Sequence, residues 1–127
     1  MSYYISRTLN TSFDETIDKV TVALKEEGFG VLTEIDVKAT LKKKLDVDYK
    51  PYHILGACNP PFAYQALQSE DKIGAMLPCN VIVIQQDNGV EVAAVDPIAS
   101  MQAVQNKNLG NVAAQVQAKL KKVIDSL

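Results

Sequence analysis

Both cysteines of the chain are followed by an asparagine, and both pairs lie in its middle third. The first pair, Cys58-Asn59, precedes two prolines, and the second pair, Cys79-Asn80, follows one. Thiolates are the ligands that soft ions such as Cu(I) and Zn(II) prefer, and two nearby thiols can also cycle between dithiol and disulfide. The two Cys-Asn pairs are therefore the first candidates for chemistry in this sequence.

The residues around Cys58 predict the end of a strand and the start of a helix. Apolar, strand-like residues 54–57 precede it. Asn59 suits the N-cap, where its side-chain oxygen can accept a free N–H of the first turn, and Pro60 suits the first helical position. The positive end of a helix stabilises a thiolate, so this placement can lower the pKa of a cysteine.

The second pair is expected at the opposite kind of boundary, where a strand begins. The apolar residues 81–84 follow Cys79 directly, and Asn88-Gly89 then predicts a two-residue hairpin turn with positive φ at both positions. The return strand is 90–95. In this register the first residue of the 81–84 run lies opposite Asp96, which brings the carboxylate of Asp96 close to the second Cys-Asn pair.

Whether the two thiols meet depends on the relative direction of their strands. Cys58 ends one strand and Cys79 begins the next, so an antiparallel pair places both at one edge of the sheet, and this arrangement is expected. Two thiolates do not complete a tetrahedral zinc site, so Met76, Asp96 or a second subunit would have to supply further ligands. The alternative for Met76 is that it fills a gap in the core.

The only histidine is expected to lie apart from the cysteines. Alternation along strand 52–58 places His53 and Cys58 on opposite faces, and five residues of strand separate them by about 16 Å. His53 is therefore not expected to share a metal with Cys58, although it could act on another surface or across a dimer interface. The serines and this histidine form no nucleophile–base pattern, and the sequence has no glycine-rich phosphate loop, so a hydrolase is disfavoured.

Composition indicates an ordinary globular protein. The 127 residues are 47% hydrophobic and 22% charged, with a formal net charge of −2. We expect a single domain over residues 1–127. The acidic balance disfavours nucleic acid as a partner, no apolar run reaches the roughly 18 residues of a membrane span, and the N-terminus does not resemble a signal peptide. A cytoplasmic location is therefore expected, where structural disulfides are rare.

The remaining pattern predicts the elements that position these residues. Ser12 begins a capping box with Glu15, which starts a helix that ends near Gly28. Asp36 can cap a short helix over 37–45, whose lysines form either an anion-binding patch or, as the acidic total favours, a solvated face. The expected strands are 3–8, 29–35, 52–58, 81–84 and 90–95, and further helices are expected at 60–70, just after Asp96, and at the C-terminus.

Together these elements predict an α+β fold. Its sheet is expected to be mainly antiparallel with about five strands, in a β-α-β-β-β-β-α core that has helices packed on one face and short extra helices.

The motifs also resemble a known family. The run of residues 52–67, together with residues 74–81, closely resembles domain-of-unknown-function family 302, and the segments 28–41 and 95–97 and the terminal helix agree with it. The resemblance covers nearly the whole chain. It implies a small bacterial or archaeal α+β protein that forms homodimers, and it implies no activity and no role for the Cys-Asn motifs.

Three functional interpretations follow from these residues. The first is a non-enzymatic homodimeric module that binds a ligand or another protein, in which Asn59, Asn80, Asp96 and helix N–H groups line a pocket and the cysteines are small apolar walls. The second is a thiol site at Cys58 and Cys79, with Met76, that binds a soft metal or cycles as a redox dithiol. The third is that both motifs only shape the fold, because free cysteines are often buried and inert.

Of these interpretations, a module rather than an enzyme is the expectation. No cofactor is assigned. The expected partners are a second copy of the chain and a small ligand or soft metal, with neither nucleic acid nor membrane.

Overall fold

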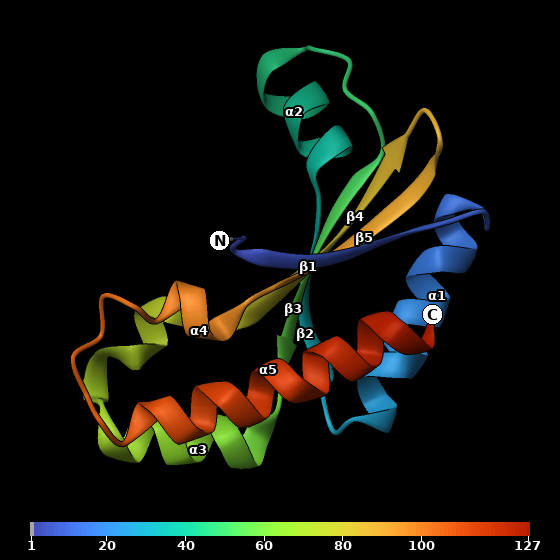
Figure 1. The fold of residues 1–127 in the computed structure, drawn as a ribbon. Helices are drawn as coiled ribbons and strands as arrows, with labels where there is room; N and C mark the ends of the chain where they lie inside the picture. Colours follow the sequence, from blue (N-terminus) through green and yellow to red (C-terminus); the bar gives the residue numbers. More distant parts are fainter. Residues whose placement is uncertain (1) are drawn as a thin grey trace.

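Five antiparallel strands form one sheet in the computed structural model, which describes residues 2–127 (Figure 1). Their order in the sheet is β1-β5-β4-β3-β2, so the first strand of the chain forms one edge and the second forms the other. The strands are β1 (Tyr4–Leu9), β2 (Gly30–Asp36), β3 (Tyr52–Cys58), β4 (Cys79–Gln86) and β5 (Gly89–Val95).

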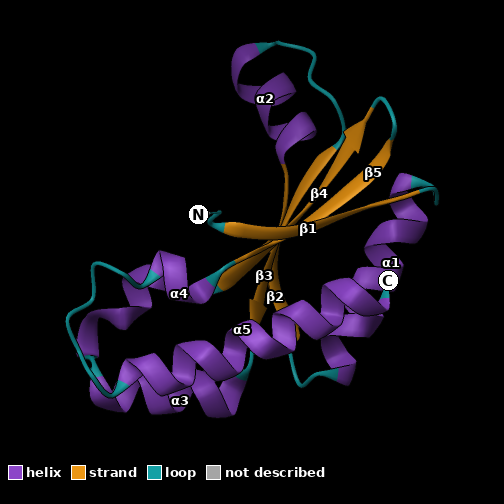
Figure 2. Ribbon diagram, viewed as in Figure 1, coloured by secondary structure: helices purple, strands orange, loops and turns teal. Residues whose placement is uncertain are grey.

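Helices cover one face of this sheet. Figure 2 shows α1 and α5 together on one side, with α3 beside α5, while α2 stands out from the opposite side. The helices are α1 (Phe13–Glu26), α2 (Val37–Leu45), α3 (Pro60–Ser69), the 3₁₀ helix η1 (Asp71–Met76), α4 (Pro97–Ser100) and α5 (Leu109–Ser126). The predicted α+β fold, with its β-α-β-β-β-β-α core and helices on one face, is confirmed.

The core lies between the covered face of the sheet and the helices. Side chains that alternate along β3 and β4 point into it, and burial of each such side chain stabilises the fold by about 1.5–3 kcal/mol. Among its members that are less than 2% exposed are Leu55, Val81, Val83, Val92, Val20, Leu24, Leu120 and Val123.

Both ends of α1 follow the signals in the sequence. The hydroxyl of Ser12 accepts a hydrogen bond from the backbone N–H of Glu15 at 3.2 Å. At the other end Gly28 has φ +86°, its N–H donates to the carbonyl of Lys25, and the next N–H, of Phe29, donates to Leu24. This pair of bonds is a Schellman motif, in which a glycine adopts the left-handed conformation that a side chain disfavours.

The predicted register of the last hairpin is wrong by two residues. Gln86 pairs with Gly89, so the loop is residues 87–88, and Val81 pairs with Ala94 rather than with Asp96. Nor does Asn88 adopt a positive φ, because Asp46 is the only non-glycine residue in the described part of the chain that does.

A contact from another strand explains the shift. Gly89 has φ +143°, and a Cβ at this position would lie 2.5 Å from the carbonyl oxygen of Leu9 in β1. The glycine is needed where β1 approaches the backbone of β5, and not at the centre of the turn. The position of this glycine depends on a tertiary contact with β1, so the local Asn-Gly pattern predicted the wrong turn.

Within residues 2–127, none of the helices combines the length and the apolar character that crossing a membrane requires.

Candidate functional site

The two Cys-Asn pairs come together at one end of the sheet. Strands β3 and β4 are antiparallel, and Ala57 pairs with Cys79. Cys58 therefore lies one position beyond the partner of Cys79, which confirms the expectation that both cysteines lie at the same edge. Both are free thiols.

The ladder also separates the two side chains. Cys79 shares a face with its partner Ala57, the face that the helices cover, whereas Cys58 is the next residue along and has the opposite orientation in the alternation. Cys79 is 8% exposed, and Cys58 is partly exposed. The two thiols are therefore neighbours in the ladder that point to different sides of the strand end.

A small cavity lies beside them. Its volume is about 30 Å³, and both cysteines and Asn59 contribute to its wall. A cavity of this size holds one or two water-sized groups. The rest of the wall is almost entirely apolar and includes Phe29, Phe62, Leu77, Met101, Val112 and Val116.

The environment of Cys79 favours the neutral thiol. Burial, with a smaller contribution from the charge of Cys58, raises the pKa of Cys79 from 9.0 to about 11. A thiolate is the form that attacks disulfides and binds metals, so at neutral pH Cys79 is poorly prepared for either reaction.

Asn59 occupies the N-cap of α3 but does not cap it with its side chain, contrary to the prediction. Its Nδ2 instead donates to the carbonyl of Glu27 at 3.2 Å, and the side chain packs against Gly28. It thereby satisfies a carbonyl at the C-terminal end of α1. Asn59 is only 8% exposed and ties the β3–α3 junction to the α1–β2 turn.

The other predicted site residues lie outside the cavity wall. Asp96 caps α4, where its Oδ1 accepts from the N–H of Ile98 at 2.9 Å, and both of its carboxylate oxygens accept from Gln117 Nε2. Asn80 is exposed. Met76, at the end of η1, is 39% exposed. Of the predicted residues, the structure therefore brings Cys58, Asn59 and Cys79 to one cavity and places the other three elsewhere.

His53 has partners of its own. Its Nδ1 lies 2.8 Å from Glu34 Oε1, its Nε2 lies 3.5 Å from Asp36 Oδ2, and Phe13 packs edge-on against the ring. Because Tyr52 and Cys58 bound β3, His53 lies at the other end of the strand from the cavity. In the described chain, no group of three or more His, Cys, Asp or Glu side chains is arranged to hold a metal ion.

Sequence reasoning missed the part of the cavity wall that comes from the end of the chain. The apolar spacing of the last helix predicts that Val112 and Val116 are buried, and both are. The sequence does not indicate that they pack over the Cys-Asn motifs, because that contact joins residues more than thirty positions apart.

The comparisons with known proteins agree with this architecture. The family model described as "Domain of unknown function DUF302" matches residues 5–127. A crystal structure described as an uncharacterized conserved protein DUF302 from Bacillus stearothermophilus matches with a TM-score of 0.92 and 28% sequence identity, over 98% of this chain and 98% of that chain. Among proteins with curated descriptions, none matches the chain. The motifs, the fold and these matches together show that the chain belongs to the DUF302 family.

Proposed function

We propose that this chain is a non-enzymatic binding module that works as a homodimer and holds a small ligand beside its Cys-Asn motifs. The observation that carries the proposal is the convergence of both motifs, distant in sequence, on one apolar cavity at the end of β3 and β4. Helices α3 and α5, together with Phe29 and Met101, complete the wall, so the site is built from several separate parts of the chain.

The cavity restricts the ligand. A space of about 30 Å³ with apolar walls suits a very small apolar species, or an apolar group that displaces Met101. Methionine is flexible and polarizable, so it is well suited to give way to such a group. The Nδ2 of Asn59 already donates to Glu27, which leaves the walls with mainly apolar contacts to offer.

The alternative is a thiol site for a soft metal or for redox exchange. The presence of both cysteines in one wall supports it. The raised pKa of Cys79 opposes it, because a dithiolate site needs both sulfurs ionised. The binding module is therefore the preferred function.

Homodimer formation is supported by apolar surface that the chain leaves uncovered. Leu45 of α2 is 66% exposed, and Tyr4 of β1 is 42% exposed. Tyr4 lies on one edge strand and α2 follows the other, so exposed apolar side chains on both edges are available for contacts with a second copy.

Xenon tests the ligand site, because it is a small apolar probe that enters dry cavities. Methyl-labelled protein under xenon pressure should show shifts at Leu77, Met101 and Val112. The variant Ala113→Val narrows the cavity and should reduce these shifts, whereas Ala114→Val, an exposed neighbour on the same helix, should not. Equal shifts in both variants, or none in the parent chain, would contradict a ligand site here.

Sedimentation equilibrium tests the homodimer, and a single species at monomer mass at all concentrations would remove that part of the proposal.

Titration of the reduced protein with Cu(I) tests the alternative. Tight stoichiometric uptake that Cys79→Ser abolishes would favour the thiol site over the module.

A further inference from the structure

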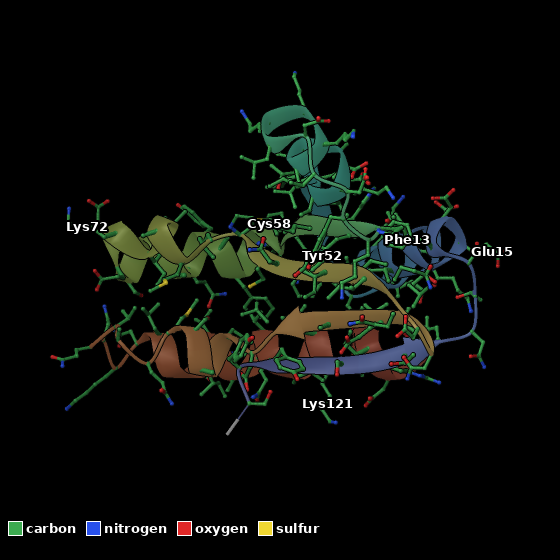
Figure 3. All side chains as sticks on the ribbon, turned by 90° about the horizontal axis from the view of Figure 1, so that it is seen from above. Phe13, Glu15, Tyr52, Cys58, Lys72 and Lys121 are labelled. Atoms are coloured by element: carbon green, nitrogen blue, oxygen red, sulfur yellow. The ribbon has the colours of Figure 1, made fainter. Side chains whose placement is uncertain are left out.

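The face of the sheet opposite α1 and α5 is apolar over its middle strands and only partly covered: Ile54 and Ile82 are partly exposed there, whereas Ile84 and Ala93 are buried by their neighbours. Figure 3 looks onto the sheet with α5 behind it, and Tyr52 lies over the middle of this open face. In the ladder, Ile54, Ile82 and Ala93 lie side by side on this face, and Ile35 extends it onto β2. Ile35 is 47% exposed although it sits among apolar neighbours.

The sequence of β4 is that of a strand covered on both faces. Its residues 81–84 are Val-Ile-Val-Ile, without the polar alternation of an antiparallel strand that has one face in water. The two valines are fully buried under the helices, whereas on the open face Ile84 is 9% exposed and Ile82 is only partly buried. The helices of the chain cover one face of β4, and the apolar pattern predicts that the other face is covered as well.

A hollow of about 240 Å³ lies on the open face between tyrosines and isoleucines. Its one carboxylate, Glu91, accepts a hydrogen bond from Gln86 Nε2 at 3.0 Å. Partial burial, followed by the neighbouring Tyr49, Tyr3 and Glu91, raises the pKa of Tyr52, so its phenol stays neutral. The hollow is thus lined by tyrosine rings and apolar side chains and contains a single carboxylate.

Helix α2 is only loosely packed against β2 and β3 of its own chain. None of its nine residues is buried, and Leu45 at its end is 66% exposed. Isolated helices shorter than about 12–15 residues are marginal in water, and most helices are stabilised by packing of an apolar face. Figure 1 shows α2 projecting from the end of the sheet, away from α1 and α5.

We propose that a second copy of the chain covers the open face, and that each copy lays its α2 on the open sheet face of the other. This inference rests on the proposed homodimer and locates its interface. One chain carries both an apolar sheet face that is only partly covered and a helix that exposes Leu45, and in a dimer with a two-fold axis each copy can cover these surfaces of the other.

Charge and size favour a second copy. Helix α2 carries four lysines and no acidic residue. Lys42 pairs with Asp46 and Asp48 of the same chain, and the positive charge of the other three lysines complements Glu91 in the hollow. Five strands about 4.8 Å apart and about seven residues long project a face of roughly 500 Å². With α2 added, and because a side-chain surface exceeds its projection, this approaches the roughly 800 Å² per partner of a standard interface.

Variants of the intact chain test the interface by sedimentation equilibrium. Leu45→Ser on α2 and Ile82→Glu on the open face should each raise the dimer dissociation constant more than tenfold. Leu67→Ser is the matched control, because Leu67 is also an exposed helical leucine, at 45%, but lies on α3 in the covered half. It should leave the dissociation constant within about twofold of the parent value, since surface substitutions away from a contact are nearly neutral.

Zero-length carbodiimide cross-linking of mixed ¹⁴N- and ¹⁵N-labelled chains identifies contacts between copies. The expected product joins Glu91 of one copy to a lysine of α2 in the other. A parent dimer that keeps its affinity in both variants, or whose cross-links map to the β1 edge or to α3, would overturn this interface while leaving the homodimer intact. A monomeric parent chain would overturn both.

Discussion

The two faces of the sheet are built from the same strands but are completed differently. On the helix side, α1, α3 and α5 close over the strands so fully that only about 30 Å³ remains beside the cysteines. On the open side a hollow of about 240 Å³ lies among tyrosines, isoleucines, an alanine and one glutamate. The helices of the chain are enough to cover one face, and the apolar residues of the other face are the basis of the proposed contact with a second copy.

The two Cys-Asn motifs also differ in how far they are buried. Asn59 is buried and bonded to the end of α1, whereas Asn80 is exposed. The repeated dipeptide therefore has one structural role in the first motif and a different environment in the second. A repeat in sequence does not imply a symmetric site.

The largest difference in stability is expected between alanine substitutions at two neighbouring residues of β3, Leu55 and Ile54, which lie on opposite faces of the sheet. Leu55→Ala removes a fully buried side chain and should lower the free energy of unfolding by about 2–5 kcal/mol. Ile54→Ala on the open face should cost the monomer less, about 1 kcal/mol, because that side chain is already partly in water. Urea denaturation of dilute protein measures both, and equal losses would contradict the distinction between the two faces.

Substitution of Gly56 should destabilise the fold, because the side chains of Thr33 and Pro78 cover this position at the cavity end of the sheet. A Cβ there would collide with Thr33 Oγ1 and lie 2.8 Å from Pro78 Cγ, so Gly56→Ala should lower the free energy of unfolding by about 1–3 kcal/mol. Adding Thr33→Ala removes the nearer clash and should restore part of the loss in urea denaturation. Strict additivity of the two substitutions would count against this explanation.

The two asparagines should differ when each is replaced. Asn59→Ala leaves a carbonyl of α1 without its donor and should cost about 1–3 kcal/mol of unfolding free energy. Asn80→Ala should stay within about 0.5 kcal/mol, as is usual for an exposed position. Thermal and urea unfolding of both variants measure the difference, and a reversed order would show that the second motif is the structural one.

The smallest effect should be a pH dependence from Cys79. Its pKa is higher in the folded chain, at about 11, than its ordinary value of 9.0, so the unfolded chain ionises first. Stability is therefore fully present below about pH 9 and falls as the pH rises through about 11. The fall should be shallower in Cys79→Ala, and an identical slope in both proteins would remove burial of this thiol as its cause.

The sequence predicted the features that depend on neighbouring residues. Ser12 and Asp36 cap their helices because each side chain reaches an N–H three residues on. Gly28 ends α1 because a left-handed residue is needed there. Alternation along β3 correctly separated His53 from Cys58, because it follows from strand geometry alone.

Features that depend on distant residues were not predictable in the same way. Gly89 serves the approach of β1, so the hairpin register shifted and Asp96 moved from the predicted site to the cap of α4. Asn59 found a carbonyl in α1 rather than an N–H of its own helix. The cavity wall from α5 and the uncovered state of α2 depend on packing that no local pattern encodes.

The measurement that tests the account most directly compares the two faces in solution. Relaxation of methyl signals by a soluble nitroxide, recorded on the parent chain at low and high protein concentration, reports which side chains meet solvent. We expect Leu55 and Val83 to be protected at both concentrations, and Ile54 and Ile82 to become protected only at the higher one. Isoleucine methyls that stay equally accessible at all concentrations would contradict the claim that a second copy covers the open face.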